Sequence, residues 1–174
     1  MSKIFAGILV MTKLQVKDGE SEELVALLQR RGKINTDNGY GFKNQSFAGL
    51  CEATSYGKAE GNETPEQALE REMTEELGVE AVKTIFAAKP VILYKNTEKD
   101  GDKVYIWTCL ADKNILKEIK LDISSAGIEI LRKSDLPRVR FATFDQKGLT
   151  VKNADDIDIF EVPKEALEKA FAMF

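Results

Sequence analysis

Three glutamates within one helical turn carry the clearest chemical signal in this 174-residue sequence. In the stretch REMTEELG, Glu72, Glu75 and Glu76 stand three and four residues apart, so a helix would hold their carboxylates within an arc of about 100°. Like charges at these spacings repel one another, and the C-terminal end of a helix disfavours anions. A divalent cation removes both conflicts, because Mg²⁺ and Mn²⁺ prefer oxygen ligands. A solvated acidic face is the alternative, but the spacing favours a site for a hard metal ion.

Composition narrows the chemistry further. The chain has no histidine, which excludes histidine-based catalysis and most zinc sites and leaves carboxylates as the natural metal ligands. Its net charge of −4 argues against nonspecific binding to duplex nucleic acid, which requires a basic surface. A nucleotide substrate stays compatible with this charge, because bound metal cations screen phosphates.

The cysteines and the apolar segments indicate in which cellular compartment the protein is expected. Cys51 and Cys109 belong to no pairing motif and stand among apolar residues, so we expect reduced core cysteines in a cytoplasmic protein. The N-terminal apolar run lacks the small-residue cleavage site of a signal peptide. No stretch reaches the ~18 apolar residues of a membrane span. We therefore expect no membrane partner.

The helix predicted over residues 65–77 is marked at both ends. Thr64 is a good N-cap, Pro65 suits the first helical position, and Gln67 completes a capping box. Gly78 supplies the stop signal. The buried stripe of this helix is expected to consist of Leu69, Met73 and Leu77.

Strand patterns surround this helix on both sides. Residues 81–94 are expected to hold one strand, or two with a break at Pro90, and residues 163–174 form a second helix. Helices covering a sheet indicate an α/β fold of the α+β type. The turn-like Asp100-Gly101 suits an antiparallel pair and so favours a mixed sheet. Strands are also predicted at residues 4–11, 104–110, 127–131 and 160–162, loops at 12–21 and 33–44, an extended segment at 46–56, and a turn or short helix at 133–138. Residues 24–30 suit a helix or a strand, and a strand is preferred because the run is short and ends before Gly32.

The glutamate helix and the loop before it resemble the signature of the Nudix hydrolases. That signature reads G-x5-E-x7-R-E-U-x-E-E-x-G-U, where U is apolar, and residues 57–79 match it without departure. Inside the spacer, Asn62 rather than glycine precedes Glu63, which should alter the turn more than the chemistry. The matched positions are Gly57, Glu63, Arg71, Glu72, Met73, Glu75, Glu76, Gly78 and Val79.

The resemblance implies a single Nudix domain over residues 1–174, folded as a three-layer α/β/α sandwich with a mixed sheet. It also implies hydrolysis of a nucleoside diphosphate linked to another group. Glu72, Glu75 and Glu76 would bind Mg²⁺ or Mn²⁺, with the backbone carbonyl of Tyr56 as a further ligand. One of these glutamates, or an acid outside the motif, would deprotonate the attacking water. Supporting roles are implied for Gly57, Glu63, Arg71 and Gly78.

The sequence leaves two side-chain assignments open. Arg71 can pair with Glu75 one turn later, or with Glu63 before the helix. For the acid outside the motif we favour Glu129, because GIEIL forms a short strand before the SDLP turn, where the family often places such an acid. The other candidates are Glu98, Asp102 and Glu118.

The sequence also leaves the substrate and the oligomeric state undecided. A nucleotide base needs aromatic stacking in a largely apolar cleft, and the candidates are Tyr40, Phe42 and Phe47. Substrates in the family include ADP-ribose, NADH, dinucleoside polyphosphates, nucleoside triphosphates and capped RNA ends, of which the acidic balance disfavours the last. A non-catalytic nucleotide-sensing domain on the same fold is one alternative function, and an acidic structural protein without a ligand is another. Homodimers are common in the family, so a homodimer stays open.

Overall fold

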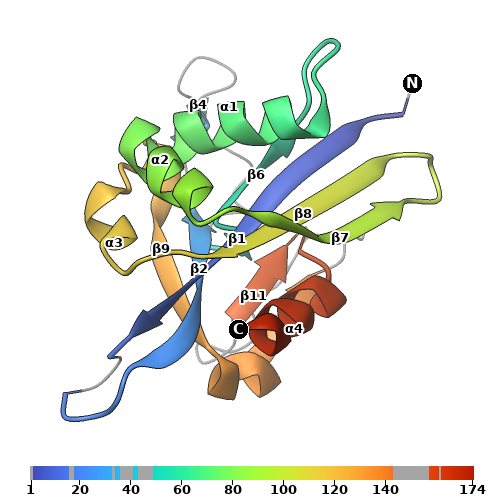
Figure 1. Ribbon diagram of the computed structural model, residues 1–174. Coiled ribbons are helices and arrows are strands. Elements are labelled where there is room, and N and C mark those ends of the chain that lie inside the picture. The colour runs from blue at the N-terminus through green and yellow to red at the C-terminus, as the bar shows by residue number, and fades with distance from the viewer. Residues whose placement is uncertain are drawn as a thin grey trace.

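A mixed β-sheet forms the middle layer of the molecule, with helices on both of its faces (Figure 1). The longest strand, β1 (Ile4–Leu14), runs parallel to β8 (Lys103–Leu110) and antiparallel to β2 (Glu23–Arg31). The remaining strands are β5 (Cys51–Glu52), β6 (Ser55–Lys58), β7 (Val91–Thr97), β9 (Ser125–Arg132), β10 (Val139–Ala142) and β11 (Ile157–Phe160), with a separate ribbon of β3 (Ile34–Asn35) and β4 (Gly41–Phe42). In this computed structural model the described residues are 2–15, 18–32, 34–35, 41–42, 49–142, 157–160 and 162–174.

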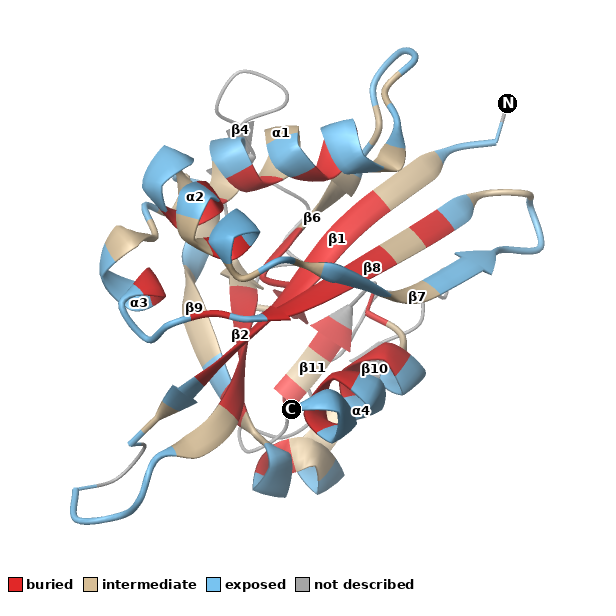
Figure 2. Cartoon of the chain, viewed as in Figure 1, coloured by how far each residue is buried: buried red, intermediate tan, exposed pale blue. Residues whose placement is uncertain are grey.

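The helices divide between the two faces of the sheet. One face is covered by α1 (Pro65–Leu77), α2 (Val79–Ala87) and α3 (Ile115–Glu118), and the other by α4 (Lys164–Met173) (Figure 1). In each helix the buried residues lie on the side next to the sheet and the exposed residues on the outer side (Figure 2). Because successive side chains of a strand point to opposite faces, the sheet forms two separate apolar cores, one on each face. This arrangement confirms the three-layer α/β/α sandwich with a mixed sheet.

Three local predictions were wrong. The strand expected at residues 160–162 lies earlier, since β11 covers Ile157–Phe160. Residues 81–87, expected to be strand, belong to α2, and the strand β7 begins only at Val91, after the break at Pro90. Ala81, Val82 and Ile85 are buried, a spacing that suits one helical face better than one strand face. The loop predicted at 12–21 also begins too early, because β1 continues to Leu14 and pairs there with Glu23 of β2.

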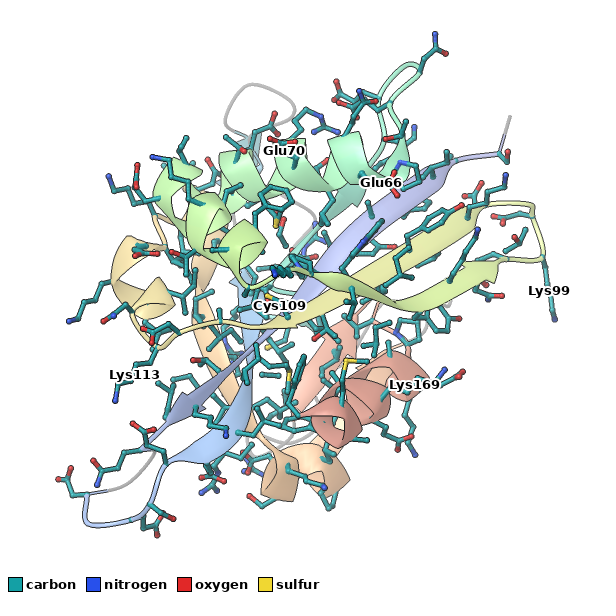
Figure 3. All side chains as sticks on the ribbon, in the orientation of Figure 1. Glu66, Glu70, Lys99, Cys109, Lys113 and Lys169 are labelled. Carbon is teal, nitrogen blue, oxygen red and sulfur yellow. The ribbon has the colours of Figure 1, made fainter. Side chains whose placement is uncertain are left out.

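The two cysteines and the surface charges follow the burial pattern. Cys51 and Cys109 are both free and buried, as expected. Figure 3 shows Cys109 in the interior, whereas Lys99, Lys113 and Lys169 extend outward from the surface. In the part of the chain that the structure describes, no helix combines the length and the apolar character needed to span a membrane.

The start of α1 has the predicted capping box. The Thr64 side chain accepts a hydrogen bond from the Gln67 backbone N–H at 3.3 Å, and the Gln67 side chain accepts one from the Thr64 N–H at 2.9 Å. These reciprocal bonds satisfy two N–H groups that the helix itself leaves without acceptors. Ala68, Leu69, Met73 and Leu77 form its buried side, so the predicted stripe is confirmed.

Replacing Thr64 with alanine should lower the free energy of unfolding by about 1 kcal/mol, because the cap is lost. Urea unfolding of the metal-free protein measures this change. Thr74→Ala is the matched control, since the Thr74 hydroxyl donates to the Glu70 carbonyl within the same helix, and such a bond contributes little. Equal losses in the two variants would contradict the capping role of Thr64.

Candidate functional site

A pocket opens where β1 and β2 diverge beneath α1. β1 pairs with β2 over Val10–Leu14 and with β6 over Phe5–Ile8. Between these two pairings, β5 joins β2 through the pair Gln29 and Glu52. The pocket has a volume of about 840 Å³. It is lined by Gln29, Arg31, Glu52, Tyr56, Gly57, Lys58, Ala59, Glu60, Gly61, Glu72, Glu75, Glu76, Asp122 and Ser124.

Glu76 is held at the floor of this pocket by β6. The Ser55 hydroxyl donates to Glu76 Oε2 at 2.6 Å, and the Tyr56 backbone N–H donates to the same oxygen at 3.2 Å. Burial raises the pKa of Glu76 to about 8, and the negative charges of Glu52 and Glu72 add to the effect against the two hydrogen bonds. The beginning of β6 therefore orients a carboxylate that is costly to ionise without a nearby cation.

Glu72 lies directly against the motif glycine. A Cβ built on Gly57 would fall 1.9 Å from the Glu72 carboxyl carbon and 2.0 and 2.4 Å from its oxygens. A side chain at position 57 would thus occupy the place of this carboxylate. Burial raises the pKa of Glu72, while the adjacent Arg71 opposes that rise. Glycine is required at position 57 because the Glu72 carboxylate lies so close to its backbone, and not because of its backbone angles.

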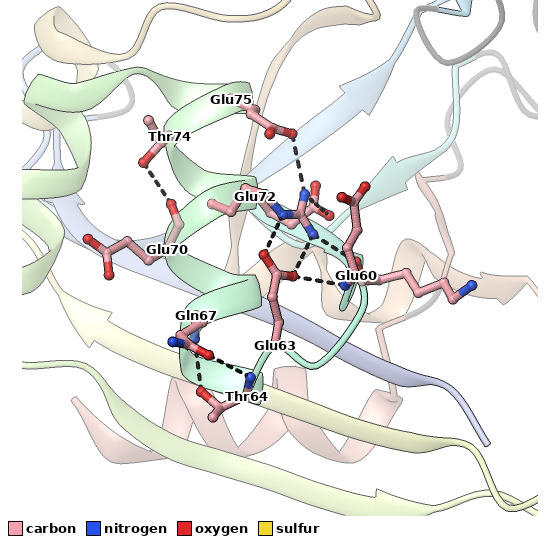
Figure 4. Close-up of polar contacts among 10 residues, drawn as sticks. Glu60, Glu63, Thr64, Gln67, Glu70, Glu72, Thr74 and Glu75 are labelled. Atoms are coloured by element: carbon pink, nitrogen blue, oxygen red, sulfur yellow. Dashed lines mark hydrogen bonds and ion pairs between the residues drawn. The ribbon is translucent and has the colours of Figure 1, made fainter. Parts of the chain in front are cut away.

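Arg71 fastens the loop before α1 to the helix. Its acceptors Glu63, Glu72 and Glu75 are labelled in Figure 4. Its guanidinium donates to both oxygens of Glu63 at 2.9 and 3.1 Å, to Glu72 Oε1 at 2.9 Å, and to the Lys58 carbonyl at 2.9 Å. It also reaches Glu75 Oε2 at 3.4 Å, so the two pairings left open by the sequence occur together. The hydrogen bonds from Arg71, and then from the Glu60 N–H, lower the pKa of Glu63. Glu63 thus stays charged and locks the loop.

The C-terminal end of α1 is closed by the segment that follows α3. Gly78, with φ of 85°, ends the helix. The N–H groups of Lys120 and Asp122 then donate to the carbonyls of Leu77 at 2.8 Å and Glu76 at 3.3 Å. These bonds satisfy carbonyls that a helix end leaves without donors. They also bring Asp122 and Ser124 to the pocket wall.

The donor chemistry of this pocket fits a hard divalent cation. Glu72, Glu75 and Glu76 all line it, and Mg²⁺ and Mn²⁺ take carboxylate oxygens. As the side chains stand, no group of three or more acidic or cysteine residues in the described ranges gathers around one point. Arg71 engages Glu72 and Glu75, and Ser55 engages Glu76, so the carboxylates would change partners to share a cation.

The structure does not bring Glu129 together with these carboxylates. Glu129 of β9 stands opposite Leu28 of β2, and Leu28 and Leu131 pack into the core on the α4 side. Because side chains alternate along a strand, Glu129 faces away from α1 and forms an ion pair with Arg30. Glu98, Asp102 and Glu118 do not line the pocket either.

Other predicted residues lie outside the described part. Tyr40 and Phe47 are not among the described residues, and of Phe42 only the backbone, in β4, is described. Outside the motif stretch of residues 57–79, the sequence analysis missed five pocket residues: Gln29, Arg31, Glu52, Asp122 and Ser124. For Glu52 a weak signal exists, since it alternates with the apolar Cys51 and Ala53 in an extended segment.

Comparison with known proteins gives a consistent result. The sequence matches the family model of the NUDIX domain over residues 12–144. A mutT/nudix family protein from Listeria innocua has 17% identity and a TM-score of 0.55, over 78% of this chain and 82% of its own. A protein from Deinococcus radiodurans has 18% identity and a TM-score of 0.53, over 78% and 71%. At these identities the structures show a shared fold. No curated protein sequence matches this chain significantly.

The fold, the matching family model and the carboxylate-lined pocket define an enzyme that hydrolyses phosphoric anhydride bonds. Because the family model spans more than half of the chain, the chain belongs to the Nudix family. Members of this family generally depend on divalent cations.

Proposed function

We propose that residues 1–174 form one Nudix hydrolase domain that uses Mg²⁺ or Mn²⁺ to cleave a nucleoside diphosphate linked to another moiety. The substrate would be a small nucleotide such as ADP-ribose, a dinucleotide or a nucleoside triphosphate. The observation that carries this proposal is the pocket of about 840 Å³ with Glu72, Glu75 and Glu76 together in its wall. β11 and α4 lie beyond the matched residues 12–144, yet β11 is a strand of the same sheet and α4 packs on it, which supports one domain.

Each residue of the motif has a defined task in this proposal. Glu72, Glu75, Glu76 and the Tyr56 carbonyl would hold the cation. When bound, Mg²⁺ would screen the charge of the pyrophosphate and lower the pKa of a bound water. Ser55 and the Tyr56 N–H orient Glu76. A carboxylate of the pocket would accept the proton of the water that attacks phosphorus.

Arg71 and Glu63 have a different task, which is to position the others. Their paired hydrogen bonds hold the loop carrying Lys58 and Glu60 against α1. Correct placement matters because charge stabilisation in such a site depends on groups that are oriented before the reaction.

The chain around Arg31 supports the predicted base-binding residues. The Arg31 carbonyl accepts a hydrogen bond from the Gly49 N–H, and its own N–H donates to Leu50, both at 2.8 Å. Gly49 therefore lies beside Arg31, which lines the pocket. We keep Tyr40, Phe42 and Phe47, which all belong to the segment between residues 32 and 49, as the proposed base-binding residues.

A substrate panel tests the proposed function. ADP-ribose, NADH, dinucleoside polyphosphates and nucleoside triphosphates are incubated with Mg²⁺ or Mn²⁺, and the products are resolved by chromatography. We expect two phosphate-bearing products from at least one compound, and no reaction in excess chelator. Running the reaction in ¹⁸O-labelled water identifies the phosphorus that is attacked, because only one product gains the label.

The same panel distinguishes a non-catalytic nucleotide-sensing domain from the proposed hydrolase. A non-catalytic nucleotide-sensing domain would bind one of these compounds, raising the melting temperature, and would leave every compound intact with both metals. That result would overturn the proposed hydrolase.

A further inference from the structure

Glu52, an acid outside the Nudix motif, faces the motif carboxylates from the opposite wall of the pocket. It lies in β5 and pairs with Gln29 of β2. Its neighbours Cys51 and Ala53 are buried in the core on the α4 side, so strand alternation turns Glu52 toward α1. Glu52 lines the same pocket as Glu72, Glu75 and Glu76.

Glu52 is a buried carboxylate that lies close to Glu76. Glu52 is 6% exposed, and Arg31 Nη1 donates to its Oε2 at 2.9 Å. Glu52 and Glu76 lie close enough for their like charges to repel. The donors to Glu76 in the described chain, a hydroxyl and a backbone N–H, carry no charge. Glu52 and Glu76 thus both lie in this sheltered corner, and bringing two carboxylates together there is costly unless a cation joins them.

A second, independent feature points to a ligand at the same corner. Gln29 is 2% exposed and lines the pocket beside Glu52. Its amide oxygen has no hydrogen-bond partner among the described residues. A buried amide oxygen without a donor costs free energy, and amide oxygens are suitable ligands for hard divalent cations or acceptors for the waters that such cations retain.

We propose that Glu52 is a further carboxylate ligand of the divalent cations in this pocket, positioned by Arg31, with the Gln29 amide oxygen accepting beside it. This inference rests on the proposed function and extends it from the motif helix to the sheet. It assigns the role of the acid outside the motif to β5 rather than to β9.

Titration of the metal-free protein with Mn²⁺, followed by electron paramagnetic resonance without any substrate, tests this assignment. Glu52→Gln keeps the shape of the side chain and removes its charge. We expect Mn²⁺ to bind at least about 10-fold more weakly than to the wild type, or one class of site to disappear. Unchanged Mn²⁺ affinity in a folded Glu52→Gln variant would overturn the proposal.

Asp158→Asn is the matched control. The Asp158 side chain is 10% exposed and pairs with Arg140 at 2.8 Å, much as Glu52 pairs with Arg31, but it does not line the pocket. Its Mn²⁺ affinity should equal that of the wild type. An equal loss of affinity in both variants would mean that the ion pairs act through the fold, and would also overturn the proposal.

A second variant covers the case in which Glu52→Gln does not fold. Glu52→Asp keeps the charge with a shorter reach, so it should bind Mn²⁺ with an affinity between those of the wild type and a carboxylate-free site. Wild-type affinity in Glu52→Asp, with Glu52→Gln unfolded, would count against a ligand role. The failure of the proposed function is distinct, because it would appear as Mn²⁺ binding by the wild type without turnover of any nucleotide.

Discussion

Glu76→Gln is expected to lower kcat by about 10²- to 10³-fold on any substrate that the enzyme accepts, since the loss of a metal-binding carboxylate removes several kcal/mol of transition-state stabilisation. Glutamine has the same shape and can still accept the hydrogen bonds that Ser55 and the Tyr56 N–H donate to Glu76. The fold should therefore survive. Steady-state kinetics with Mg²⁺ measure the effect, and a variant as active as the wild type would remove Glu76 from the proposed ligands.

The pH dependence of stability gives a control for the same variant that needs no substrate. Burial raises the pKa of Glu76 to about 8 in the metal-free protein, above the ~4.3 of an exposed glutamate. The folded state then binds this proton more tightly than the unfolded chain, so the stabilisation is present at acid pH and is lost as pH rises through the folded pKa. In excess chelator, the free energy of unfolding of the wild type should fall between about pH 4.5 and 8, and that of Glu76→Gln should fall less. Parallel curves would contradict the buried, uncompensated state of Glu76.

Gly57→Ala should disable the enzyme while sparing its fold. The new methyl group would fall on the Glu72 carboxyl group, about 2 Å away, and the far end of this flexible side chain would have to move. Since no backbone atom is displaced, the free energy of unfolding should change by less than about 1 kcal/mol. Mn²⁺ affinity should drop by about 10-fold or more, with a larger drop in kcat. Urea unfolding and Mn²⁺ titration measure the two quantities separately.

A double-mutant cycle identifies the cause of that loss. If Gly57→Ala acts by displacing Glu72, then adding it to Glu72→Ala should cost almost no further metal affinity. Fully additive losses would mean that the methyl group acts on the loop rather than on the carboxylate.

The sequence predicted best where local rules agree with one another. Thr64, Pro65, Gln67 and Gly78 mark both ends of α1, and the structure has the helix at these bounds. The strand patterns at the positions of β1 and β8 were equally clear, because each buries a run of apolar side chains. The error at α2 has a local cause. Residues 79–87 contain many residues that occur in both helices and strands, and only the spacing of the buried Ala81, Val82 and Ile85 identifies a helix.

The site was predictable along α1 and not across the sheet. The three motif glutamates share one pocket because helical periodicity places them on one face. Glu52 reaches that pocket through the pairing of β5 with β2, and Glu129 turns away from it through the pairing of β9 with β2. Such registers are set by long-range packing, and a shift of one residue would exchange the two faces.

The backbone bonds from Lys120 and Asp122 to the end of α1 restrict how this protein could diverge. The same segment is also tied to the residue that follows β2, because the Gly32 N–H donates to the Ser124 carbonyl at 2.7 Å. Surface connections usually accept insertions and deletions, but a change of length here would pull Asp122 and Ser124 away from the pocket wall that they line. New substrate preferences could therefore arise in this segment through side-chain replacements at a constant chain length.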